Sequence, residues 1–137
     1  MLSASQGAPL FNPDPAAYLP HRFPFLMLDR LQSLDSGIRA TATRLVTDCP
    51  EGFPQVLLLE CIAQLAGIAA GHEEGEGGFL ASIDHAEFGG DVVAGDCLEV
   101  AVRIVRSFGR LVMVEGEVNS SGKQLVRAQM TLGIGRL

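Results

Sequence analysis

The sequence predicts an α+β fold in which a largely antiparallel sheet curls around one buried helix. One stretch, 54–71, has the composition of a helix, whereas two strand-like runs precede it and four follow it. Strands in this order cannot build βαβ repeats, so an antiparallel sheet is the economical arrangement. The chain has 137 residues, of which 47% are hydrophobic and 19% charged, as expected for one folded domain with one core.

The N-terminal part predicts an arm followed by a hairpin. Closely spaced prolines in residues 1–17 oppose helix formation and predict an extended arm, so that the folded domain spans 18–137. Runs 25–31 and 38–46 are rich in apolar and β-branched residues, and Asp35-Ser36-Gly37 between them suits a turn. We therefore expect two paired strands there.

The segment 54–71 predicts the single long helix. Neither glycine nor proline interrupts it between Pro54 and Gly67, and its apolar residues lie all round the helical cylinder. Such a helix is enclosed by protein on most sides. The charged, glycine-rich stretch 72–78 then predicts a solvated loop that ends it.

Four strands are expected after the loop, at 79–88, 98–105, 111–118 and 124–134. The last shows the clearest period of two, because apolar residues from Val126 to Ile134 alternate with mostly polar neighbours. Strand 79–88 would leave a hydrophobic sheet edge unpaired, so we expect a homodimer or a dimer-based oligomer that covers it.

Composition excludes several kinds of partner and cofactor. Sixteen acidic against ten basic residues give a net charge of -6, which disfavours nucleic acid. The apolar run 56–70 is shorter than the ~20 residues that span a membrane, and no signal peptide is evident, so we expect a cytoplasmic protein. Cys49, Cys61 and Cys97 lack the spacing of a disulfide framework or a zinc site, and we expect no metal or cofactor.

A narrow stripe of polar or minimal side chains runs along the predicted helix. Glu60, Gln64, Gly67 and Gly71 follow one another at helical spacing and leave an open seam on an otherwise apolar cylinder. In one interpretation Glu60 reaches solvent at a helix edge and the glycines allow close packing. In the other, its partly desolvated carboxyl group lines an apolar cleft and is suited to proton transfer.

Four segments carry a family resemblance. Residues 19–30 (LPHRFPFLMLDR), 53–64 (FPQVLLLECIAQ), 79–88 (FLASIDHAEF) and 93–96 (VAGD) occur in the order found in the (3R)-hydroxyacyl-acyl-carrier-protein dehydratases, the FabZ/FabA-like family, which the chain resembles. The resemblance implies the hotdog fold, in which two subunits pair their sheets. It also implies acyl-thioester tunnels at the dimer interface, with acyl carrier protein or coenzyme A as the carrier.

The resemblance also implies site residues. Family members eliminate water with a histidine base and a helix glutamate from the other subunit, and Glu60 matches that glutamate. The family's histidine loop is shortened here to 49–54 and contains no histidine, while Gln55 replaces the glycine at the helix start. We therefore expect Glu60 to be catalytic, and Gln64, Gln55, Val56 and His85 to contact the substrate.

The remaining candidates have plainer interpretations. His21 is expected to be a hydrogen-bonded structural histidine and His72 to be exposed, whereas His85 could approach the tunnel. Cys61 lies in an apolar helix without a base, so packing is expected rather than nucleophilic attack.

Three functions stay open. A dehydratase would use Glu60 with a relocated base, and a thioesterase would use Glu60 to activate water or attack the thioester. A non-catalytic module would bind acyl chains or partner an active homologue. The resemblance favours a dehydratase-family acyl-thioester protein.

Overall fold

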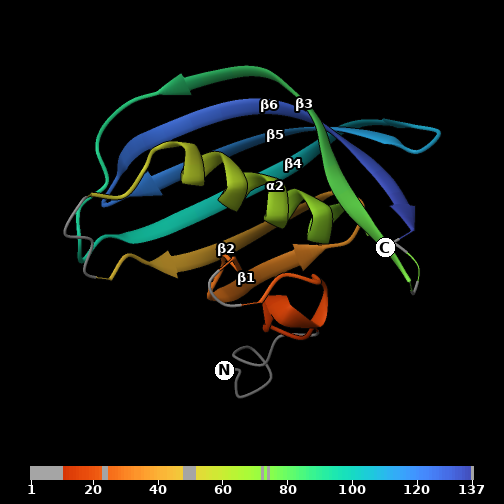
Figure 1. The fold of residues 1–137 in the computed structure, drawn as a ribbon, viewed down its shortest axis with the longest axis horizontal. Helices are drawn as coiled ribbons and strands as arrows, with labels where there is room; N and C mark the ends of the chain where they lie inside the picture. Colours follow the sequence, from red (N-terminus) through yellow and green to blue (C-terminus); the bar gives the residue numbers. More distant parts are fainter. Residues whose placement is uncertain (1–10, 23–24, 48–51, 72, 74, 137) are drawn as a thin grey trace, which may run out of the picture.

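The computed structural model describes residues 11–22, 25–47, 52–71, 73 and 75–136. One antiparallel sheet of six strands, in the order β1-β2-β4-β5-β6-β3, curls around a single long helix (Figure 1). The elements are η1 (Pro15–Ala17), β1 (Arg30–Asp35), β2 (Arg39–Leu45), α2 (Val56–Ala70), β3 (Glu76–Phe88), β4 (Cys97–Phe108), β5 (Leu111–Ser120) and β6 (Lys123–Arg136). The predicted architecture is confirmed.

Helix α2 supplies the centre of the core. Leu58, Ile62 and Leu65 are fully buried against the inward-facing side chains of β4, β5 and β6, among them Val100 and Met130. The carboxyl end of α2 is closed by the β1–β2 turn, where the backbone N–H of Gly37 donates to the Ala69 carbonyl at 2.7 Å. The hairpin predicted at Asp35-Ser36-Gly37 therefore also caps the helix.

Close contact between α2 and the sheet depends on Gly116 of β5. A Cβ atom at this position would lie 2.4 Å from Cγ2 of Ile62 and 3.2 Å from Cγ1 of Val102. No side chain larger than hydrogen fits there without movement of the helix or the strand. The glycine therefore fixes how near the helix axis comes to β5.

The first strand starts later than predicted. We expected a strand over 25–31, but β1 begins at Arg30, and backbone groups of residues 25–27 bond to side chains of α2 and β2. Gln64 of α2 accepts from the Met27 N–H and donates to the Phe25 carbonyl, each at 2.8 Å, and Arg44 donates to the Leu26 carbonyl at 3.2 Å. The prediction of a strand at 25–29 was wrong because these groups are already satisfied.

The described part of the N-terminal arm is folded, not extended as predicted. Residues 15–17 form a 3₁₀ turn whose first N–H groups are capped by Asp14, and Pro15 is buried. The Pro13 carbonyl accepts from the Leu31 N–H at 2.9 Å, which fastens the arm to β1. Residues 1–10 of the predicted arm lie outside the described residues.

The predicted loop 72–78 is shorter than expected, because β3 already begins at Glu76. Gly77 and Gly78 pair with Gly135 and Ile134 of β6, which continues to Arg136. A Cβ at Gly78 would lie 3.5 Å from the Gly67 Cα, so small residues let the strand approach α2. The glycine-rich composition of 72–78 predicted a loop, but β6 is long enough to pair with residues 76–78, and this pairing outweighs the local preference.

The sheet has two edges, β1 and β3. Several large apolar side chains of β3 are exposed, namely Phe79, Leu80, Ile83 and Phe88. Within the described ranges, no helix has the length and apolar character that crossing a membrane requires.

Candidate functional site

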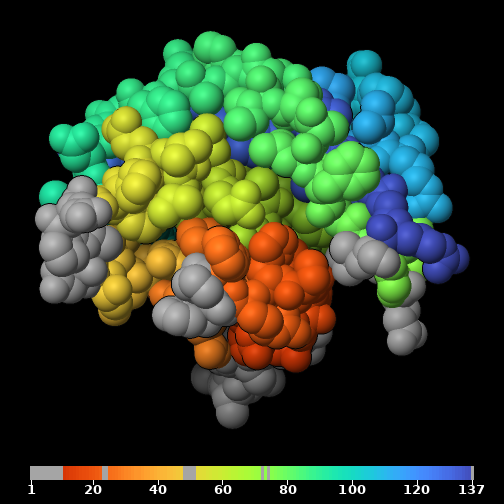
Figure 2. Space-filling view, viewed as in Figure 1, coloured from red at the N-terminus to blue at the C-terminus, as the bar shows by residue number. Residues whose placement is uncertain are grey.

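A cleft of about 480 Å³ lies beside the amino-terminal half of α2. In Figure 2 the surface of α2 is visible as a yellow-green band between β3, in green, and the orange segment that leads into β1. Its walls are largely apolar and come from three parts of the chain: His21, Phe25, Met27, Val56, Leu57, Leu59, Glu60, Leu80 and Ile83. An acyl chain is the kind of ligand such walls accept.

Among the described residues that line the cleft, Glu60 is the only one with a carboxylate side chain. Its side chain is 40% exposed, and Oε2 accepts a hydrogen bond of 2.8 Å from Gln64 Nε2. Gln64 is itself 3% exposed and fixed by the backbone of residues 25–27. The amide of Gln64 therefore holds the Glu60 carboxylate at the cleft.

His21 faces the same carboxylate. Its Nε2 lies 3.8 Å from Glu60 Oε2, and its side chain is 33% exposed. Nδ1 is buried and has no hydrogen-bond partner among the described residues. The hydrogen bond that we expected for a structural histidine is therefore not found at Nδ1 among the described residues.

The structure brings together only part of the expected substrate-contacting set. Val56 lines the cleft and Gln64 supports it, whereas Gln55 turns away and donates to the Gly90 carbonyl at 2.9 Å. His85 is exposed on β3, with Nε2 3.7 Å from Glu87 Oε1, and does not line the cleft. Within one chain, His85 therefore does not approach the cleft as we expected.

The predicted open seam along α2 is covered over much of its length. Segment 25–27 covers Gln64, and a Cβ at Gly67 would lie 3.9 Å from Leu19 Cδ2. Of this stripe only Glu60 reaches the cleft. Gly67 lets β3 approach the helix at Gly78, as the plainer interpretation held, whereas Gly71 ends the helix with a φ of 70°.

Sequence reasoning missed several cleft residues, including His21, Phe25, Met27, Leu80 and Ile83. Those of β3 carried a usable signal, since Leu80 and Ile83 are apolar side chains on a predicted edge strand. His21 carried none, because nothing in the spacing between positions 21 and 60 indicates contact. It reaches Glu60 because residues on either side of it in sequence, Leu19 and 25–27, lie against the helix.

Cys61 is buried and does not take part in the site chemistry. Burial raises the pKa of its thiol from 9.0 to about 12, which opposes thiolate formation, and its Sγ lies 3.7 Å from the Met27 carbonyl. This confirms the packing interpretation. Cys97 is exposed, whereas Cys49, the next two residues of the shortened 49–54 loop and His72 lie outside the described residues.

The described residues contain no group of three or more His, Cys, Asp or Glu side chains placed to hold a metal ion. What the cleft offers is a carboxyl group and an imidazole at one end of apolar walls. Such a pair can donate and accept protons next to a bound chain.

Comparison with known sequences gives a consistent result, although no protein-family profile matches the chain. The 3-hydroxyacyl-acyl-carrier-protein dehydratase FabZ of Bacillus subtilis is 32% identical over 130 residues, covering 85% of this chain and 92% of the relative. FabZ of Listeria monocytogenes is 33% identical over 132 residues, and that of Halalkalibacterium halodurans 34% over 129, each again covered to 92%.

Solved structures with the same fold include enzymes and ligand complexes. The dehydratase heterocomplex ApeI:P from Xenorhabdus doucetiae superimposes with a TM-score of 0.76 at 17% identity, covering 92% of this chain and 93% of that one. A Streptococcus mutans protein bound to acetyl-CoA gives 0.70 at 18% identity, covering 87% and 97%. The fluoroacetyl-CoA thioesterase FlK gives 0.66 at 15% identity, covering 75% and 96%. These likenesses confirm the hotdog fold.

Proposed function

The chain belongs to the 3-hydroxyacyl-acyl-carrier-protein dehydratase FabZ family, and on that premise we propose that it removes water from a 3-hydroxyacyl thioester in the cleft beside α2. One observation carries the proposal: a half-buried carboxylate, Glu60, is oriented by a buried amide at the end of an apolar cleft. In its acid form Glu60 would protonate the departing hydroxyl group.

The apolar walls set the substrate class. Leu57, Leu59, Leu80 and Ile83 offer no hydrogen-bonding side chains, so they suit the hydrocarbon part of an acyl group. The thioester end would then extend toward solvent, where a carrier such as acyl carrier protein or coenzyme A is accommodated.

We further propose that two copies pair through β3. Phe79 is 60% exposed, Phe88 44% and Ile83 43%, all on an edge strand whose outer side has no partner within the chain. Pairing across a two-fold axis would cover these side chains and extend the wall of the cleft. Sedimentation at micromolar concentration should find a species of twice 14.5 kDa, and a 14.5 kDa species alone would contradict the pairing.

The activity test uses two substrates. The protein is incubated with a 3-hydroxyacyl thioester and, separately, with a saturated acyl thioester, while enoyl formation and free thiol are followed. Enoyl product from the first substrate supports the dehydratase. Thiol release from the second supports a thioesterase, which the water-accessible Glu60 carboxylate would also permit. Silence with both indicates an acyl-binding or partner subunit.

A further inference from the structure

We propose that His21 is the base of the reaction and works with Glu60 of the same chain, an inference that rests on the proposed dehydration. Dehydration needs one group that accepts the proton from C2 and one that donates a proton to the hydroxyl on C3. The segment in which the family carries its histidine is shortened here and contains none. Another proton acceptor in the cleft is therefore required.

Geometry selects His21 among the described residues. Of the two histidines in the described ranges, only His21 lines the cleft, and its Nε2 is 3.8 Å from Glu60 Oε2. His85 lies outside the lining and is paired with Glu87. Two groups this close can act on adjacent carbon atoms of one bound substrate.

The surroundings of the imidazole fit a role in proton transfer. Nδ1 is buried and has no hydrogen-bond partner among the described residues. A buried polar atom left unsatisfied is uncommon in proteins and often marks a functional group. On the other side of the ring, Nε2 faces the cleft.

Neutral His21 takes the C2 proton at Nε2, the electrons of that bond form the C2–C3 double bond, and the C3–O bond breaks. The departing hydroxyl group takes the proton of Glu60 and leaves as water. Transfer of the proton from His21 Nε2 to Glu60 Oε2, over the observed 3.8 Å, restores both groups for the next turnover.

The test compares the wild type with His21→Asn and with Glu115→Gln, the latter at a position on β5 that does not line the cleft. Enoyl formation should fall by about 10²–10⁴-fold in His21→Asn and stay within about twofold in Glu115→Gln. Thermal melting checks that each variant is folded, and His21→Gln replaces His21→Asn if the latter melts early.

Rescue separates catalysis from positioning. In His21→Gly, free imidazole should restore enoyl formation by roughly tenfold or more, because a diffusing base can occupy the vacated space. A loss that imidazole does not restore, or a His21→Asn protein that keeps its rate while the wild type turns over, would overturn the role of His21 alone. A wild type that forms no enoyl product would overturn the proposed function and this role with it.

Discussion

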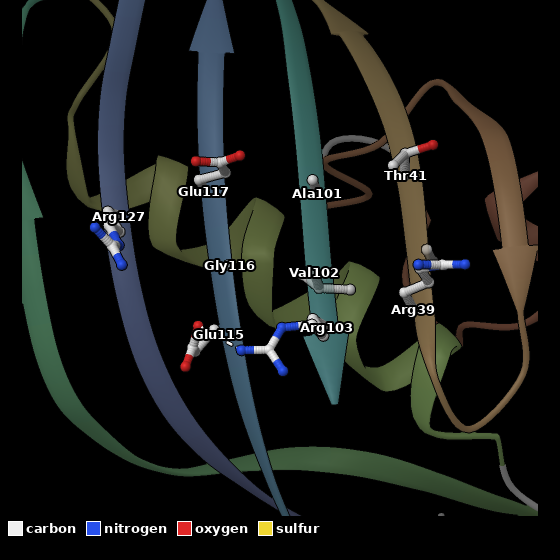
Figure 3. Close-up of a pocket in the computed structure, with 10 residues that line it drawn as sticks. Arg39, Thr41, Ala101, Val102, Arg103, Glu115, Gly116, Glu117 and Arg127 are labelled. Atoms are coloured by element: carbon white, nitrogen blue, oxygen red, sulfur yellow. Dashed lines mark hydrogen bonds and ion pairs between the residues drawn. The ribbon is translucent and has the colours of Figure 1, made fainter. Parts of the chain in front are cut away.

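Two hollows on opposite sides of the sheet carry charged side chains in different settings. The cleft beside α2 places one carboxylate and one imidazole at the end of apolar walls. The other hollow, about 330 Å³, lies on the face of the sheet that turns away from the helix (Figure 3). We call this surface the outer face. Its charged side chains are Arg39, Arg103, Glu115, Glu117 and Arg127.

On the outer face, charges of opposite sign lie side by side on neighbouring strands. Arg103 Nη2 lies 3.0 Å from Glu115 Oε2, and Glu117 stands opposite Arg127 in the β5–β6 register. The Arg103 and Glu115 side chains are 59% and 36% exposed, so water screens them and such pairs contribute little. Charge alone therefore does not mark a site. The feature that distinguishes the cleft is the Glu60 carboxylate, which a buried amide, that of Gln64, holds among apolar walls.

The largest expected effect concerns the core between the two hollows. Leu58→Asp should prevent folding, because Leu58 is fully buried and an unpaired carboxylate there costs several kcal/mol against a total stability of about 5–15 kcal/mol. Val56→Asp, two residues away on the same helix but 63% exposed, is the control for folding. Circular dichroism melting should show a cooperative transition for the control only; a cooperative melt of Leu58→Asp would show that α2 is not central.

The second prediction compares two carboxylates, Glu60 in the cleft and Glu115 on the outer face. Glu60→Gln keeps the shape of the side chain but removes the ionisable group, so turnover should fall by about 10²–10⁴, equal to roughly 3–5 kcal/mol of barrier, while the melting temperature is kept. Glu115→Gln on the outer face should leave turnover unchanged. Steady-state kinetics of both variants checks this, and equal rates for Glu60→Gln and wild type would remove Glu60 from the proposed mechanism.

A third comparison uses neighbouring residues of β5 whose side chains point to opposite faces. Gly116→Ala introduces a methyl group against Ile62 and should destabilise the protein by about 1–3 kcal/mol. Glu115→Ala, on the outer face, should change the free energy of unfolding by no more than about 0.5 kcal/mol. Urea unfolding measures both, and an unaffected Gly116→Ala would mean that α2 can shift away from the sheet at low cost.

Elements that depend on contacts between residues close in the sequence were predicted correctly, whereas features that depend on contacts between distant residues were not. The uninterrupted helix formers of 56–70 and the alternation from Val126 to Ile134 act over a few residues, and both elements appear where expected. The start of β1 was misplaced because Gln64 satisfies backbone groups 37 and 39 residues away. No local pattern reports such a contact.

In the candidate site, too, the local contact could be predicted from the sequence and the long-range contact could not. Glu60 and Gln64 are one helical turn apart, so their proximity could be read from spacing, and the structure joins them by a hydrogen bond of 2.8 Å. The proximity of His21 to Glu60 depends on long-range contacts that hold Leu19 and residues 25–27 against the helix. Gln55 and His85 were expected near the substrate by analogy, and the structure gives them other partners, Gly90 and Glu87.

The smallest effect concerns a surface ion pair that fastens the beginning of β3. Arg110, in the β4–β5 turn, donates to Glu76, and this hydrogen bond lowers the pKa of the Glu76 carboxyl from its usual 4.5. A carboxyl whose pKa is lower in the folded state contributes stability above its unfolded pKa and loses it as the pH falls. Glu76 therefore contributes at pH 7 and progressively less below about pH 4.5.

Arg110→Ala should accordingly unfold at a slightly lower urea concentration than wild type at pH 7, and the difference between the two should shrink as the pH is lowered below about 4.5. Glu76→Gln should lower stability to a similar small extent, and the double variant should lose little more than either single one if the pair acts as a unit. Arg110 also reaches the Ile134 carbonyl at 3.4 Å. A stability difference in Arg110→Ala that persists undiminished at low pH would therefore assign the effect to that contact with β6 and not to the ion pair.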